Sequence, residues 1–176
     1  MKIFIEGDIM KNVKVKAVRD NKEKEHYIND VWDILKKGYE RVDGGLHFKS
    51  KFDLIVKTYL CKIVLYNNSV IAVTVYKAKK GLKLVALSAG TRFREIAINA
   101  LKRVIKRDLK YCWMELSEAA EAFVMKVGGD KYILPNSIAQ NLLDKQVEPK
   151  EDGIHYCRTI KGVRKEKVLI GTVQLF

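Results

Sequence analysis

The hydrophobic residues of this 176-residue chain are spaced in two regular ways. Near the start, Val13, Val15 and Ala17 alternate with Lys14 and Lys16. Alternation with a period of two is typical of a strand that buries one face. Runs of strand character are therefore expected at residues 2–6, 13–19, 62–66, 70–76, 82–87 and 111–116.

Apolar residues at spacings of three and four predict helices between these strands. Ser50 and Asp53 are suited to begin a short helix, because a serine side chain caps the N-terminus and an acidic residue favours the first turn. The apolar residues of this short helix are expected to face the core: Phe52, Ile55, Val56 and Tyr59. Longer helical segments are expected at residues 21–42, 92–110, 117–128 and 135–143.

The order of these elements predicts a mixed α/β fold. Residues 67–69 (Asn-Asn-Ser) tolerate turn conformations, and they begin an antiparallel meander whose third strand is residues 82–87. That strand leads into the helix 92–110, and the next strand completes a right-handed strand–helix–strand unit. Residues 154–160 and 167–172 are expected to form a hairpin. We therefore expect one domain, 1–176, with a mostly antiparallel sheet flanked by helices.

The composition is that of a soluble globular protein, with 48% hydrophobic and 31% charged residues. No apolar run approaches the roughly 20 residues of a membrane-spanning helix, and Glu6 and Asp8 come too early for a signal peptide. Three cysteines without a C-x-x-C pair indicate free thiols in a reducing cytoplasm. The histidines lie near no second ligand at a useful spacing, so no metal is expected. No membrane partner is expected either, because the chain lacks a membrane-spanning run.

A net charge of +13 favours an anionic partner. Basic residues collect on the side of the helix 92–110 that lies away from its apolar stripe: Lys102, Arg103, Lys106, Arg107 and Lys110. Such a face predicts contact with the backbone of a nucleic acid or with an acidic protein. A lysine-rich solvated surface would give the same net charge, so both interpretations stay open.

The order of helices and strands resembles that of the GNAT superfamily of acyl-CoA-dependent N-acyltransferases. The segment SEAAEAFVMKVGG, residues 117–129, is similar to the family's N-x-x-A-x-x-F-Y-x-x-x-G-F segment. The matching positions are Ser117, Ala120, Phe123 and Gly128. The runs KFDLIVKTYL, VIAVTVYK, KVGG and DGIHYCR also look like uncharacterised GNAT-like proteins of bacteriophages. The resemblance covers residues 50–176, whereas residues 1–49 diverge.

The resemblance implies a site for acetyl-CoA or another acyl-CoA. In the family, an R/Q-x-x-G-x-G/A segment at a strand-to-helix turn holds the CoA pyrophosphate. One register places Arg92 and Ala97 in this segment, with Glu95 at the first glycine position. A second register uses residues 88–91 as the cradle, with Thr91 as the helix cap. The expected cofactor-binding residues are Ser88, Gly90, Thr91, Arg92 and Arg94. The alternative is an ordinary turn in which Gly90 only supplies backbone freedom.

The resemblance also implies that two neighbouring parallel strands lie at the centre of the sheet. These are residues 82–87 and 111–116, and they are expected to splay apart near Ser88 and Glu115. In the family, this splay makes the slot for the pantetheine arm of CoA.

The family's proton donor is replaced in this chain. Val124 stands where the family commonly has the Tyr that protonates the departing thiolate, and valine cannot donate a proton. Glu115 and Ser117 are candidate catalytic residues, with a salt-bridged carboxylate and a helix cap as their structural alternatives. Two functions follow. One is a divergent N-acyltransferase with an unknown amine acceptor, and the other is an inactive scaffold that binds nucleic acid or an acidic protein.

Overall fold

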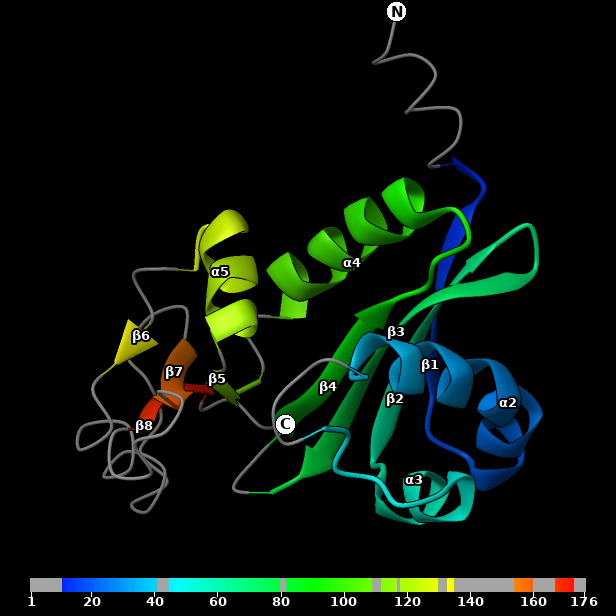
Figure 1. The fold of residues 1–176 in the computed structure, drawn as a ribbon, viewed down its shortest axis with the longest axis horizontal. Helices are drawn as coiled ribbons and strands as arrows, with labels where there is room; N and C mark the ends of the chain where they lie inside the picture. The colour runs from blue at the N-terminus through cyan, green and yellow to red at the C-terminus, as the bar shows by residue number, and fades with distance from the viewer. Residues whose placement is uncertain are drawn as a thin grey trace, which may run out of the picture. The chain divides into compact units, whose positions relative to one another are not determined.

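The computed structural model describes residues 11–40, 45–79, 82–108, 112–116, 118–129, 133–134, 154–159 and 167–172 (Figure 1). The chain forms two compact units. The first comprises residues 1–77 and 86–103, and the second comprises residues 78–85 and 104–176. Two strands and one helix therefore contribute residues to both units. The strand expected at 2–6 and the helix expected at 135–143 lie outside the described residues.

The first sheet consists of the strands that the alternation predicted. Its strands are β1 (Val13–Val18), β2 (Leu60–Tyr66), β3 (Ser69–Ala78) and β4 (Leu82–Ala89). They lie in the order β1-β2-β3-β4, and β2 is antiparallel to both β1 and β3. Asn67 and Asn68 turn the chain between β2 and β3 with φ angles of 49° and 64°. These angles are left-handed, and asparagine tolerates them better than most residues do.

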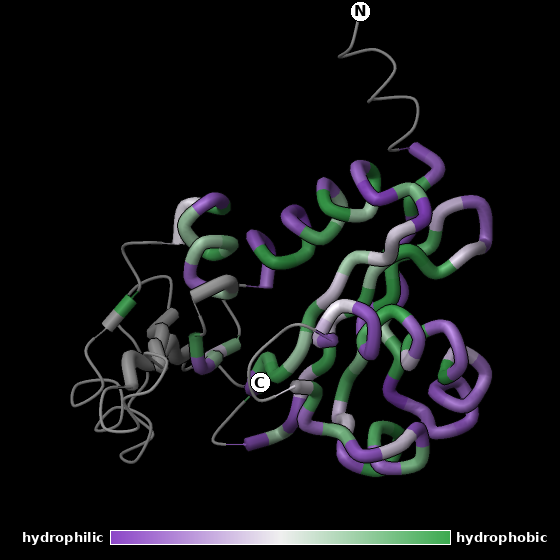
Figure 2. Tube along the Cα trace, viewed as in Figure 1, coloured by the Kyte–Doolittle hydropathy of each residue, from purple (hydrophilic) through white to green (hydrophobic). Residues whose placement is uncertain are grey.

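The core of this sheet lies along β3. All residues from Ile71 to Tyr76 are buried, so both faces of the sheet are covered at this strand. Figure 2 shows hydrophobic residues following the strands of the sheet. The edge strand β1 instead carries Lys14 and Lys16, and lysines on an edge discourage pairing with another chain.

Two helices pack on one face of this sheet. They are α2 (Asn21–Gly38) and α3 (Lys51–Lys57), and residues of both line one cavity together with residues of β1 and β2. The Asp20 side chain caps α2 by accepting a hydrogen bond from the Lys22 amide at 2.7 Å. The helix ends at Gly38, four residues before the expected end at 42.

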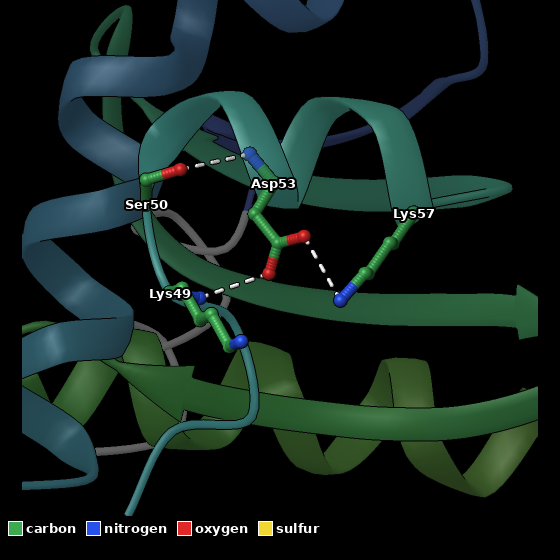
Figure 3. Close-up of polar contacts among 4 residues, drawn as sticks. All are labelled: Lys49, Ser50, Asp53 and Lys57. Atoms are coloured by element: carbon green, nitrogen blue, oxygen red, sulfur yellow. Dashed lines mark hydrogen bonds and ion pairs between the residues drawn. The ribbon is translucent and has the colours of Figure 1, made fainter.

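The predicted cap of α3 is confirmed (Figure 3). Ser50 Oγ accepts a hydrogen bond from the Asp53 amide at 3.1 Å. The Asp53 carboxylate accepts another from the Lys49 amide at 2.9 Å and forms an ion pair with Lys57 at 2.9 Å. These contacts, the Lys49 hydrogen bond above all, lower the pKa of Asp53.

The expectation about the inner face of α3 was wrong for three of its four residues. Phe52 and Val56 are 76% and 61% exposed, and Tyr59 is also exposed, whereas Leu54 is 2% exposed. Apolar residues occur all round this short helix, so the sequence pattern is compatible with either face. Contact with α2 selects the face that carries Leu54, and the half-buried Ile55 lies beside it.

Among its described residues, the second unit contains a smaller sheet and the helix α5. The sheet has the order β5-β8-β7-β6, with β5 also pairing with β7. Its elements are β5 (Met114–Leu116), α5 (Glu118–Lys126), β6 (Ile133–Leu134), β7 (Ile154–Thr159) and β8 (Lys167–Thr172). The antiparallel pair β7–β8 is the predicted hairpin. At the end of α5, Gly128 has a φ of 80° and the Gly129 amide bonds to the Val124 carbonyl at 2.9 Å, which confirms the predicted helix stop.

The two strands expected to be parallel neighbours are neighbours within the second unit. Lys83 of β4 and Trp113 form a parallel bridge. The Leu84 amide bonds to the Trp113 carbonyl at 2.8 Å, and the Trp113 amide bonds to the Leu82 carbonyl at 2.9 Å. The parallel pairing is therefore confirmed. The splay near Ser88 stays a prediction, because Ser88 belongs to the first unit.

Candidate functional site

The turn between β4 and α4 is the segment to which the family resemblance assigns the pyrophosphate of CoA. The helix α4 (Arg94–Asp108) begins two residues later than expected. Its first hydrogen bond runs from the Ala97 amide to the Phe93 carbonyl at 2.9 Å, so Phe93 and not Thr91 occupies the cap position. The cap assigned to Thr91 in the second register was therefore wrong.

Phe93 holds an uncommon backbone conformation. Its φ is 53°, a left-handed value that costs a residue with a side chain about 1 kcal/mol or more. The Phe93 ring packs edge-on against Tyr66, with ring centroids 4.9 Å apart. The Arg92 guanidinium lies over the same ring, 5.2 Å from its centroid. These two contacts fix the position of the ring. They therefore also stabilise the backbone conformation that leads into α4.

Charge at the start of α4 is mostly positive. The amides of residues 94–96 precede the first helical hydrogen bond, so they have no acceptor within the helix. Arg92 and Arg94 stand beside these amides, and Arg94 Nη1 donates a hydrogen bond to the Ala89 carbonyl at 3.4 Å. Two cations near the positive end of a helix do not stabilise that helix. Glu95 is the exception: it is exposed, in the first turn, where the helix dipole favours a carboxylate.

Gly90 has a packing role. Its amide donates a hydrogen bond to the Ile71 carbonyl at 2.7 Å, so this amide is already occupied by the sheet. A Cβ added to Gly90 would lie 3.1 Å from the same carbonyl oxygen and 3.6 Å from Ile34 Cγ1. The residue must be small because α2 and β3 approach it closely.

Ser88 also faces the helix α2. Its buried hydroxyl donates a hydrogen bond to the Ile34 carbonyl at 3.1 Å. A Cβ added to Gly38 would lie 2.0 Å from Ser88 Oγ, so the hydroxyl occupies the space that the glycine leaves free. The Ser88 side chain therefore joins β4 to α2, and its assignment to the cofactor site stays untested.

Sequence reasoning missed Tyr39, which follows α2 directly. The Tyr39 hydroxyl accepts a hydrogen bond from the Leu87 amide at 3.0 Å. Burial raises the pKa of Tyr39 above its usual value, so the hydroxyl keeps its proton. In the sequence, Tyr39 only completes the apolar stripe of a helix, and nothing in that stripe indicates a contact 48 residues away.

In the second unit, Glu115 forms an ion pair. Its carboxylate lies 3.2 Å from Lys83 Nζ, and Lys83 also lies over the Trp113 ring, 4.7 Å from the centroid. This ion pair is the structural role that the sequence analysis weighed against a catalytic role for Glu115. Ser117 lies outside the described residues. Val124, at the position of the family's Tyr, is 1% exposed and belongs to the core.

Three of the basic residues on α4 are exposed: Arg103, Lys106 and Arg107. Lys102 is half-buried, and Lys110 lies outside the described residues. A partner for this face stays a prediction. Among the described residues, no group of three or more His, Cys, Asp or Glu side chains could hold a metal ion. None of the described helices is both long and apolar enough to cross a membrane.

A cavity under α2 and α3 contains a buried lysine. Lys24 Nζ donates to the carbonyl of Thr58, to that of Ile55 at 3.2 Å and to Asn21 Oδ1 at 3.4 Å. Burial lowers the pKa of Lys24 and raises the pKa of the neighbouring Cys61 thiol to about 12. The lysine thus caps the C-terminal end of α3, and the thiol is unreactive at neutral pH.

Comparison of the sequence with family models and with curated proteins finds no match. Among solved structures, the N-acetylglutamate synthase of Neisseria gonorrhoeae matches with a TM-score of 0.50 and 9% identity. The match covers 92% of this chain and 35% of the longer synthase chain. The chain has a GNAT-like fold.

Two smaller acetyltransferases match over nearly their whole length. The ribosomal-protein-S18-alanine N-acetyltransferase of Escherichia coli has a TM-score of 0.47 and 12% identity, over 93% of this chain and 96% of its own. The diaminobutyrate acetyltransferase EctA of Paenibacillus lautus has a TM-score of 0.46 and 13% identity, over 92% and 96%.

Proposed function

We propose that this protein transfers an acyl group from acyl-CoA to an amine. The observation that carries the proposal is the start of α4, where the amides of residues 94–96 have no acceptor within the helix and the guanidinium groups of Arg92 and Arg94 contact residues of the same turn. Backbone amides at a helix N-terminus, with arginines beside them, are suited to bind phosphate groups. The N-acetylglutamate synthase that shares the fold was solved with coenzyme A and N-acetylglutamate.

In this proposal, the pyrophosphate of acyl-CoA binds the amides of residues 94–96. Arg92 and Arg94 supply the positive charge that the family pattern obtains from glycine amides. Arg92 is held in place by the Phe93 ring, so less rotational freedom is lost when it binds an anion. Bound acyl-CoA supplies the activated acyl group, and the protein holds it in position for attack by the amine. The amine acceptor stays open.

Removing the charge of Glu95 tests this proposal, because the affinity for acetyl-CoA should then rise. A carboxylate about 5 Å from a phosphate charge costs about 1 kcal/mol in a water-like dielectric, which applies because Glu95 is exposed. The variant Glu95→Gln should therefore bind acetyl-CoA about fivefold more tightly in a calorimetric titration at low ionic strength. Arg94→Gln should bind more weakly. Glu25→Gln, an exposed carboxylate on α2, is the matched control and should change nothing.

One result would overturn the proposal. If neither the wild type nor Glu95→Gln gives heat or a melting shift with millimolar acetyl-CoA, the turn does not bind the cofactor. The scaffold hypothesis, with the α4 basic face as its binding surface, would then be favoured. The cytoplasmic location and the likeness to bacteriophage proteins stay predictions.

A further inference from the structure

The contact between Tyr39 and Leu87 joins a side chain to the backbone of a strand. Leu87 is a residue of β4, and strand amides ordinarily bond to a neighbouring strand. Here the amide donates to a phenol oxygen at 3.0 Å instead. The hydrogen bond is partly buried, and both Tyr39 and Leu87 keep part of their surface exposed.

The hydroxyl hydrogen of Tyr39 is available to a ligand. The oxygen accepts from Leu87, and no acceptor for its hydrogen is found among the residues that the structure describes. A hydroxyl that accepts a hydrogen bond is polarised and becomes a stronger donor. Such a half-buried donor without an acceptor indicates a place where an oxygen atom of a ligand can bind.

Packing alone does not account for this hydroxyl. The end of α2 is already joined to β4 one residue further on, where Ser88 Oγ bonds to the Ile34 carbonyl and fills the space beside Gly38. A phenylalanine at position 39 would keep the ring contacts. The hydroxyl adds an acceptor for the Leu87 amide and, in its own hydrogen, a donor that this amide does not use.

The position along β4 indicates which part of a ligand would reach it. Leu87 precedes Arg94, the first residue of α4, by seven residues, a span of at most roughly 25 Å of chain. A ligand whose anionic end binds at the start of α4 would therefore place an uncharged part beside Leu87. Burial near Tyr39 disfavours charge, as its raised pKa indicates, so the expected acceptor is a neutral oxygen.

We propose that the Tyr39 hydroxyl donates a hydrogen bond to the carbonyl oxygen of the acyl group carried by acyl-CoA. This inference rests on the proposed function. Tyr39 then stabilises the negative charge that develops on this oxygen when the amine attacks, and it keeps its proton throughout. It is a hydrogen-bond donor and does not replace the acid that is missing at Val124.

Acetyl-CoA and free CoA together test this role, because they differ in the acetyl carbonyl. The wild type should bind acetyl-CoA more tightly than CoA, and Tyr39→Phe should lose about fivefold of that preference. The affinity of Tyr39→Phe for CoA should stay unchanged, whereas a general structural defect would lower it. Tyr27→Phe, which changes a half-buried tyrosine within α2, is the matched control and should keep the preference.

A measurement on the wild type covers the case in which Tyr39→Phe does not fold. In a ¹⁵N-labelled sample, the Leu87 amide signal should shift with acetyl-CoA and not with CoA. If acetyl-CoA binds but the variant keeps the preference, or the Leu87 signal responds equally to both ligands, the role of Tyr39 is wrong while the proposed function stands. If the wild type binds neither ligand, the proposed function and the role of Tyr39 are both wrong.

Discussion

Replacing Gly38 by alanine tests how closely α2 packs on β4. Gly38 is the last residue of α2, and a Cβ at this position would lie 2.0 Å from Ser88 Oγ and 2.9 Å from Ser88 Cβ. Real Cβ atoms essentially never approach within 3.0 Å, so the serine side chain has to move. That movement also breaks the hydrogen bond from Ser88 Oγ to the Ile34 carbonyl.

Three contributions to the free energy of unfolding change in Gly38→Ala, and they do not all have the same sign. Overpacking of this kind costs about 2 kcal/mol, and loss of a buried hydrogen bond costs about 1 kcal/mol. Alanine has a higher helix propensity than glycine, which offsets about 1 kcal/mol. We therefore expect Gly38→Ala to lower the free energy of unfolding by about 2 kcal/mol.

Urea unfolding of a double-mutant cycle provides the assay. Ser88 Cα lies 4.0 Å from the added Cβ, which is an ordinary contact, so Ser88→Gly removes the clash. The double variant Gly38→Ala/Ser88→Gly should then be no less stable than Ser88→Gly alone. A Gly38→Ala protein as stable as the wild type, or a cycle without a coupling energy, would refute the reasoning.

Two further predictions concern α3. Leu54→Ala should cost about 2–5 kcal/mol of unfolding free energy, because Leu54 is buried, whereas Val56→Ala on the exposed face should change it by less than about 0.5 kcal/mol in the same urea assay. The lowered pKa of Asp53 means that its contribution to stability is present above the unfolded-state pKa and is lost as pH falls through the lower folded-state pKa. Asp53→Asn should therefore reduce the loss of thermal stability between neutral pH and about pH 3, and an unchanged acid dependence would contradict this.

Local signals in the sequence predicted local structure well. The Ser50 cap, the Asn67–Asn68 turn and the glycine stop at Gly128 are all confirmed. Each depends on residues only a few positions apart, since caps and turns are closed by the hydrogen bonds of neighbouring residues. The strands of the first sheet were predicted for the same reason, because alternation is a property of the segment itself.

Features that depend on distant residues were not predictable in this way. Phe52 and Leu54 are both apolar, and only the position of α2 determines which of them is buried. Gly90 was assigned to the cofactor site, with backbone freedom as the alternative, and neither interpretation anticipated that the closeness of the Ile71 carbonyl and of Ile34 requires its small size. Tyr39 could not be linked to Leu87 from the sequence, because only the fold brings them together.

The departures from the family pattern fall on glycines and on one tyrosine. Glycines at a phosphate-binding turn serve by letting amides approach the anion, and a chain without them needs another source of positive potential. Arg92 and Arg94 are such a source, but they act through charge more than through shape, so binding at this turn should weaken more steeply with salt than binding by amides alone. The tyrosine position is occupied by the core residue Val124. The proposed hydrogen bond from Tyr39 to the acyl carbonyl would not replace that acid, so proton transfer to the departing thiolate should be left to solvent and be slower than in enzymes that keep the tyrosine.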